Sequence, residues 1–158
     1  MIDPTARDRD AAGRALNARP RDALGRPLPR GAQGVPRLPD DLDLGPRETL
    51  VAAQRLIDEG NAFQAHDVLE AAWKASAPAD RWVWRALAQL AVGLTHAQRG
   101  NHRGAAALLR RGADGIDRPD VPHDVDAAGL IRDARALADD LAEGRDVGAE
   151  RLRLTLSR

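Results

Sequence analysis

The chain has 158 residues, of which 43% are hydrophobic and 30% charged, a balance that predicts one globular domain able to bury a core. Its 24 basic and 24 acidic residues cancel, which argues against a chain-wide attraction to nucleic acid or to an anionic membrane. Cysteine is absent, which excludes disulfides and thiolate metal sites, and no apolar run has the length of a membrane span or the character of a signal peptide. We therefore expect a cytoplasmic protein without membrane contact.

Residues 1–45 differ in composition from the rest of the chain. Asp3 followed by Pro4 predicts the start of a short polar helix that ends near Asn17. The stretch 14–39 is rich in Pro and Gly and contains six Arg but one acid, which predicts an extended arm. This arm is interpreted as a linker laid along the bundle, and binding of an acidic protein partner is its alternative role.

From residue 46 onward, apolar residues recur at helical spacing, and Gly, Asn, Asp and Pro mark the ends of helices. Five helices are predicted, over about residues 46–60, 61–76, 80–99, 101–115 and 124–143. We therefore expect an all-α fold, a compact bundle over residues 46–145. The remainder, 146–158, alternates apolar and polar residues and is expected to form an extended tail or a frayed last helix.

Gly-Asn pairs at 60–61 and 100–101 are predicted to end one helix and to cap the next. Gln64 extends the first of these caps into a capping box, and Asp124 is predicted to cap the fifth helix. Because the same device recurs, two similar helical hairpins are expected.

The third predicted helix is apolar on every side, so we expect it to be the central buried helix of the bundle. Two of its interior polar residues, Gln89 and His96, are two turns apart and share one face, which Arg85 and Arg99 continue. A buried amide or imidazole without a partner costs about 1–3 kcal/mol. Partners are therefore expected on the neighbouring second helix.

On the second helix, His66 and Glu70 are one turn apart, and Phe63 and Trp73 follow the same stripe. The two stripes predict one buried polar cluster between the two helices. Its candidate binding residues are His66, Glu70, Trp73, Arg85, Gln89, His96 and Arg99.

Other conspicuous residues have structural interpretations. Trp82 and Trp84 are expected in the core, and His123, in a Pro-rich loop, is expected to face solvent. The Arg110-Arg111 pair suits the C-terminal end of a helix dipole.

The pattern His66-x-x-x-Glu70-x-x-Trp73, followed by Gln89-x6-His96-x-x-Arg99-Gly-Asn, resembles the bacterial domain-of-unknown-function family 309. The resemblance covers about residues 46–112 and implies an all-α bundle with one helix surrounded by others. It implies no established activity. Asp67 stands where many relatives have Glu.

Four hypotheses for the polar cluster stay open. Our interpretation is a structural network that fixes the register of the two helices in an interaction or ligand-binding domain. One alternative is a divalent-metal site of His66, Glu70 and His96, with no other cofactor expected. Another is an acid–base enzyme with Glu70 and His96 as catalytic residues and an arginine as anion clamp. The last is an interaction module, including a homodimer; nucleic acid is not expected, because few aromatic residues could stack bases.

Overall fold

The computed structural model describes residues 21–22, 24–28, 34 and 44–158, and the chain divides into two compact units, Met1–Val35 and Pro36–Arg158. In the first unit, the described residues form a tight turn. Asp22 Oδ1 accepts hydrogen bonds from the backbone N–H groups of Leu24 (3.0 Å) and Arg26 (2.8 Å). The predicted polar helix and most of the predicted arm lie outside the described residues.

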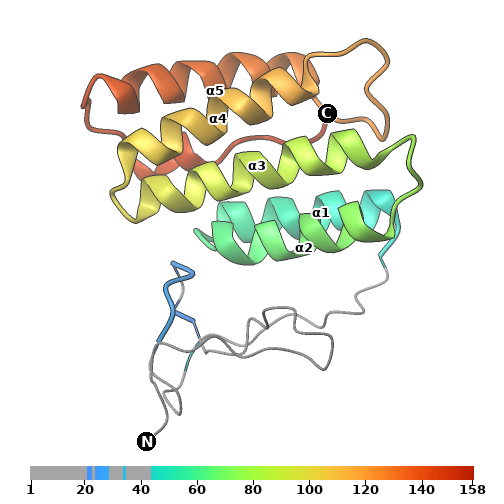
Figure 1. Cartoon of the computed structure of the whole chain (residues 1–158), viewed down its shortest axis with the longest axis horizontal. Helices are drawn as coiled ribbons and strands as arrows, with labels where there is room; N and C mark the ends of the chain where they lie inside the picture. The colour runs from blue at the N-terminus through green and yellow to red at the C-terminus, as the bar shows by residue number, and fades with distance from the viewer. Residues whose placement is uncertain (1–20, 23, 29–33, 35–43) are drawn as a thin grey trace, which may run out of the picture. The chain divides into compact units, whose positions relative to one another are not determined.

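The described part of the second unit contains five α-helices and one short 3₁₀ helix. They are α1 (Pro46–Asp58), α2 (Ala62–Ala75), α3 (Arg81–Gln98), α4 (His102–Ile116), α5 (Ala127–Ala142) and η1 (Ala149–Leu152). Each helix packs against the next along the chain, and α3 lies in the middle of the series, between α2 and α4 (Figure 1). The predicted all-α bundle with a central helix is confirmed.

Helix α3 contributes the largest set of buried residues, which are Val83, Trp84, Ala86, Leu87, Ala88, Leu90, Ala91, Gly93, Leu94 and Thr95. The sequence predicted that this helix is buried on every side. That prediction is wrong, because Arg81 and Arg85 are exposed. A series of helices covers its middle member on two sides and leaves room for a polar face. That face carries charges whose burial without a partner would be unfavourable.

Glycines allow α3 and α4 to approach each other closely. A Cβ atom on Gly93 would lie 2.9 Å from Leu109 Cγ, and one on Gly112 would lie 2.7 Å from Leu90 Cδ2 and 3.0 Å from the Ala86 carbonyl oxygen. Any side chain at these positions would push the two helices apart. The glycines therefore fix the spacing of the seam between α3 and α4.

The two predicted Gly-Asn turns are confirmed and are alike. Gly60 and Gly100 adopt φ values of +81° and +80°, in the left-handed region that favours glycine. In each turn, the N–H of the Asn after the glycine donates to the carbonyl five residues before it, that of Leu56 (2.7 Å) in the first turn and that of His96 (2.9 Å) in the second. This is the hydrogen-bond pattern of a Schellman cap.

The predicted N-terminal caps differ in detail. Asn101 caps α4 by accepting from the N–H of Gly104 (3.1 Å), whereas Asn61 precedes α2 without a side-chain cap bond. Helix α5 is capped by Asp126 and not by Asp124. Asp124 does not cap the helix because its φ of +57° lies outside the backbone conformation of an N-cap residue.

The C-terminal segment (residues 153–158) is extended and lies in the core. Leu154 and Leu156 are buried, and the side-chain amide of Gln54 on α1 donates to the Leu154 carbonyl (3.0 Å) and accepts from the Leu156 N–H (2.8 Å). On its other side the segment pairs with the start of α5, where the N–H of Asp126 donates to the Leu156 carbonyl (2.9 Å). The chain thus ends beside the loop between α4 and α5 (Figure 1).

Candidate functional site

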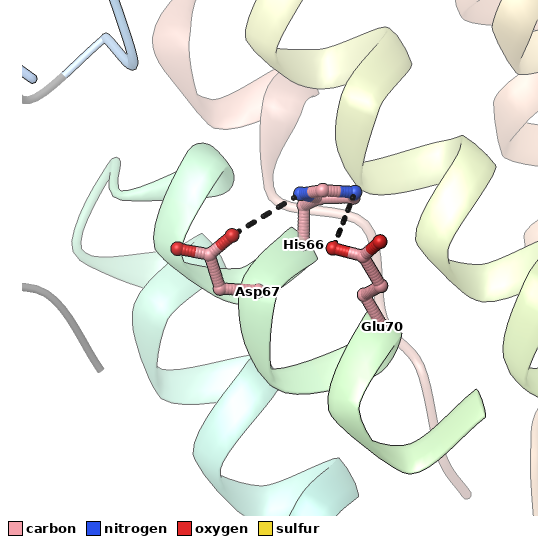
Figure 2. A group of neighbouring side chains, drawn as sticks. All are labelled: His66, Asp67 and Glu70. Carbon is pink, nitrogen blue, oxygen red and sulfur yellow. Dashed lines mark ion pairs between the residues drawn. The ribbon is translucent and has the colours of Figure 1, made fainter. Parts of the chain in front are cut away.

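Three ionisable side chains gather on one side of α2 (Figure 2). His66 Nε2 lies 3.8 Å from Glu70 Oε2, and His66 Nδ1 lies 3.5 Å from Asp67 Oδ1. Both distances exceed those of good hydrogen bonds, and Nδ1 is buried without a hydrogen-bond partner. Lys74 adds a positive charge, with Nζ 3.5 Å from Glu70 Oε1. The group is therefore a loose ion cluster confined to one helix.

The predicted cluster shared by α2 and α3 is not formed, and that prediction is wrong. His96 Nδ1 lies 3.0 Å from Asn101 Nδ2, and the described residues contain no hydrogen bond among His66, Glu70, Gln89 and His96. The register of the hairpin explains the separation. Gln98 donates to the Gly60 carbonyl (2.9 Å), so the last turn of α3 lies beside the first residues of α2 and not beside Glu70.

The burial predicted for this cluster is also too deep. The side chains of His66 and Glu70 are 22% and 35% exposed, so water reaches both groups. Partial exposure lowers the cost of placing these two side chains on α2, whereas the buried Nδ1 atom of His66 stays without a hydrogen-bond partner.

One group of residues could hold a metal ion. His66, Asp67 and Glu70 each offer one ligand atom, and these atoms lie within 4.8 Å of one another. The set differs from the predicted one, because Asp67 takes the place of His96.

An open hollow of about 670 Å³ lies where α3 begins and α4 ends. We call it the arginine hollow, defined by Trp73, Arg81, Trp82, Arg85, Gln89, Arg111 and Arg118, with Ala86, Asp114 and Gly115 beside them. Three of the predicted binding residues, Trp73, Arg85 and Gln89, meet here and not beside His66. Arg99 lies at the opposite end of α3, as its C-cap residue.

Residues of the neighbouring helices α3 and α4 line the hollow. Arg81, Arg85 and Gln89 follow at intervals of four residues along α3 and therefore share one face. Arg111 comes from α4, and Arg118 follows that helix by two residues. The guanidinium groups thus reach the hollow from two sides.

The four arginines of the hollow have no carboxylate partner within the part of the chain that the structure describes. Arg81 Nε donates to the Ser76 carbonyl (3.3 Å), and the guanidinium of Arg118 lies over the Trp82 ring, 4.3 Å from its centroid. Such a cation–π contact holds both side chains in place without neutralising the charge.

The single carboxylate beside the hollow is already engaged. Asp114 Oδ1 accepts from Arg135 Nη2 of α5 (2.9 Å), and this hydrogen bond raises the pKa of Arg135 above its ordinary value. Arg110, the neighbour of Arg111 in sequence, pairs with Asp139 (2.8 Å). The bundle thus neutralises the arginines next to the hollow and leaves those of the hollow without acids.

The sequence analysis missed the α4 half of the hollow and the loop that follows. His123 was predicted to face solvent, and that prediction is wrong. Its ring stacks on Trp84 with ring centroids 5.4 Å apart, and its Nε2 lies 3.4 Å from Asp80 Oδ2. Three non-glycine residues of this loop, Asp120, His123 and Asp124, have positive φ values, an unfavourable backbone held by the surrounding contacts. The Pro residues indicated a loop, but no sequence signal placed it against α3.

The fold and these sites define an all-α bundle protein with a loose ion cluster on α2 and an arginine-lined hollow between α3 and α4. Residues 50–108 match the model of the family described as domain of unknown function (DUF309), which confirms the resemblance seen in the sequence. The matched range includes α2 and α3 but ends before Arg111 and Arg118. No curated protein and no solved structure matches the chain significantly. None of the helices in the described residues combines the length and the apolar character needed to cross a bilayer.

Proposed function

We propose that this protein is a ligand-binding domain and that the arginine hollow is its binding site. The observation that carries the proposal is the convergence of two tryptophans, one amide and four arginines around one open space of about 670 Å³. Binding sites for small molecules have volumes of roughly 300–1,000 Å³ and combine aromatic walls with a few polar groups. Arg81 and Arg118 have structural contacts, with the Ser76 carbonyl and the Trp82 ring, but none of the four charges has a carboxylate partner among the described residues.

In this proposal the ion cluster on α2 has a supporting role. His66 lies 5.8 Å, between ring centroids, from Phe63 and close to both Asp67 and Glu70, so the imidazole contacts groups of its own helix on every described side. These contacts order the solvent-facing side of α2, the helix that also carries Trp73. This role replaces the structural network predicted between two helices, because the described contacts of the cluster join residues of α2 alone.

Chemical-shift mapping with a library of neutral, cationic and anionic small molecules tests the proposal on the full chain. We expect binders to shift backbone signals of residues 81–89 and 111–118 and the indole N–H signals of Trp73 and Trp82. The indole signal of the buried Trp84 serves as the internal control. Shifts confined to other surfaces, or none with any compound, would contradict the proposal.

A second candidate is a divalent-cation site, favoured by the three ligand atoms of His66, Asp67 and Glu70. One imidazole nitrogen and two carboxylates suit several divalent metals. Such a site would revive the alternative of a metal-dependent enzyme, with Asp67 in the position first assigned to His96 and Glu70 either ligand or base.

Calorimetric titration with Zn²⁺ and Mn²⁺ tests this second candidate. We expect a 1:1 complex that is lost in His66→Ala and kept in His102→Ala, which removes an exposed imidazole at the start of α4. Equal binding by both variants would assign the metal to another surface.

A further inference from the structure

We infer that the ligand of the arginine hollow is a small molecule that carries a phosphate or diphosphate group. This inference rests on the proposed function and adds to it the chemical class of the ligand. It follows from the charge of the hollow, the directions from which its donors come, and its size.

Charge is the first argument. Arg81, Arg85, Arg111 and Arg118 surround one space, and none has a carboxylate partner in the described residues. Asp114, the acid beside them, is bound by Arg135. Like charges around one hollow repel each other, and a bound anion converts this repulsion into attraction. A neutral or cationic ligand would leave the repulsion in place.

The number and direction of the donors favour phosphate over carboxylate. A guanidinium group presents a planar fork of N–H donors, and one planar carboxylate accepts one such fork. Here Arg81 and Arg85 approach from α3, while Arg111 and Arg118 approach from α4 and the residues after it. The oxygens of a phosphate point in several directions and can accept from both sides at once.

The N-terminus of α3 also favours a negative charge at this end of the helix. Arg81 and Trp82 are the first two residues of this helix of 18 residues, and Asp80, at its N-cap, makes no side-chain cap hydrogen bond. Backbone N–H groups at a helix N-terminus favour negative charge. The positive end of the α3 dipole thus lies at the same end of the helix as Arg81 and Arg85, next to the carboxylate of Asp80, which lies 3.4 Å from His123 Nε2.

The floor of the hollow gives an anion space to enter. Gly115 of α4 lies against Ala86 of α3, and a Cβ atom on Gly115 would be 3.3 Å from the Ala86 Cβ and 3.9 Å from Gln89 Oε1. Gly115 and Ala86 thus place no bulky side chain in this part of the lining. Trp73 and Trp82 offer flat apolar surfaces beside it, which suit the organic part of a ligand.

Size and overall charge favour a small molecule over nucleic acid. Proteins that bind nucleic acid typically contact about 6–10 phosphates along an extended basic surface. Here the unpaired charges gather in one hollow of about 670 Å³, and the chain as a whole is neutral. A hollow of this size matches the site of one small molecule.

Isothermal titration of the full chain with five probes tests the inference: diphosphate, ADP, inorganic phosphate, citrate and adenosine. We expect diphosphate and ADP to bind best, phosphate to bind more weakly, and citrate and adenosine to bind at least about tenfold more weakly than ADP, as the loss of one charge-assisted hydrogen bond requires. Higher salt should weaken the binding of ADP.

Two variants with a matched control locate the site. Arg85→Ala and Arg111→Ala should each weaken ADP binding about tenfold or more, whereas Arg110→Ala, which removes the same charge one residue away, should leave it unchanged. Should a variant fail to fold, the series of probes on the unaltered chain still decides the chemical class.

Each adverse result has its own meaning. Adenosine binding as tightly as ADP would overturn the phosphate inference and leave the hollow as a binding site. Citrate binding as tightly as diphosphate would reduce the hollow to a general anion site. A short RNA, titrated in addition to the five probes, would overturn the small-molecule class if it bound more tightly than ADP. Each of these results contradicts the inference. If none of the five probes binds, the inference fails, while chemical-shift mapping still decides the proposed function.

Discussion

The C-terminal segment and the arginine hollow use polar groups in opposite ways. In the segment, backbone groups between two buried leucines are matched by the amide of Gln54 and by the start of α5. In the hollow, four guanidinium groups gather without an ion pair among the described residues, because the one acid of its lining, Asp114, is bound by Arg135. Matched polar groups stabilise a fold, whereas an excess of one charge has a use only when something else supplies its counterpart. The comparison separates the part of the molecule that maintains the bundle from the part available for binding.

The largest expected effect comes from truncating the buried end of the segment. Leu156→Ala should lower the free energy of unfolding by about 2–5 kcal/mol, because it removes buried apolar surface and leaves a cavity. Urea denaturation measures the change. Thr155→Ala, at the exposed position between the two leucines, is the control and should change little. Equal stability of the two variants would show that the segment does not belong to the core.

A smaller effect is expected from Gln54, whose amide serves both a donor and an acceptor of the segment. Gln54→Leu should cost about 1–3 kcal/mol, since it leaves the Leu156 N–H and the Leu154 carbonyl without this partner. Gln54→Glu keeps the acceptor but loses the donor and places a carboxylate beside Asp58, to which the amide also donates (2.9 Å), so thermal unfolding should show it to be less stable than the unaltered chain. A Leu variant as stable as the parent would mean that water replaces the amide.

Neighbouring arginines on α4 sharpen the comparison. Arg111→Ala should change the free energy of unfolding by no more than about 0.5 kcal/mol, because the charge it removes has no described partner. Arg110→Ala breaks the contact with Asp139 and should cost up to about 1 kcal/mol. Both changes are measured by chemical denaturation without added ligand. A larger loss for Arg111→Ala would give the hollow a structural role.

The smallest effect concerns pH. Hydrogen bonds from Arg145 (2.7 Å) and Arg151 (2.9 Å) hold the pKa of Asp140, near the end of α5, below its ordinary value. A carboxylate with a lowered folded pKa stabilises the fold above its ordinary pKa, and this contribution is lost as pH falls through the folded value. Asp140→Asn should therefore be slightly less stable than the parent at pH 7, and the difference should disappear in acid. A difference that persists at pH 2 would exclude this origin.

The helices were predictable because their ends are marked locally. Gly60, Gly100 and the Asn residue after each fix two turns through backbone conformation alone, and the structure places helix ends within a few residues of the prediction. The central position of α3 followed from its apolar composition. Helix ends and helix composition depend on residues that are neighbours in the sequence, so a sequence pattern is enough to predict them.

The site was less predictable because it depends on register and on distant chain segments. His96 shares a face of α3 with Gln89, but the antiparallel hairpin places it beside Asn101 and the start of α2. In the sequence, Arg111 suited the helix dipole, and Arg118 lay beyond the predicted fourth helix and was not considered for the site. Only the packing of α4 on α3 brings both to Arg81, about thirty residues away in sequence. Spacing along a chain cannot contain that information.

The placement of the aromatic residues has a practical consequence. The chain has three tryptophans and no tyrosine, so its intrinsic ultraviolet fluorescence comes from indole alone. Trp73 and Trp82 border the arginine hollow, and Trp84 is 3% exposed beneath His123. A quencher in solution should reach the first two emitters and spare the third. The protein thus contains a built-in optical reporter of occupancy that needs no dye.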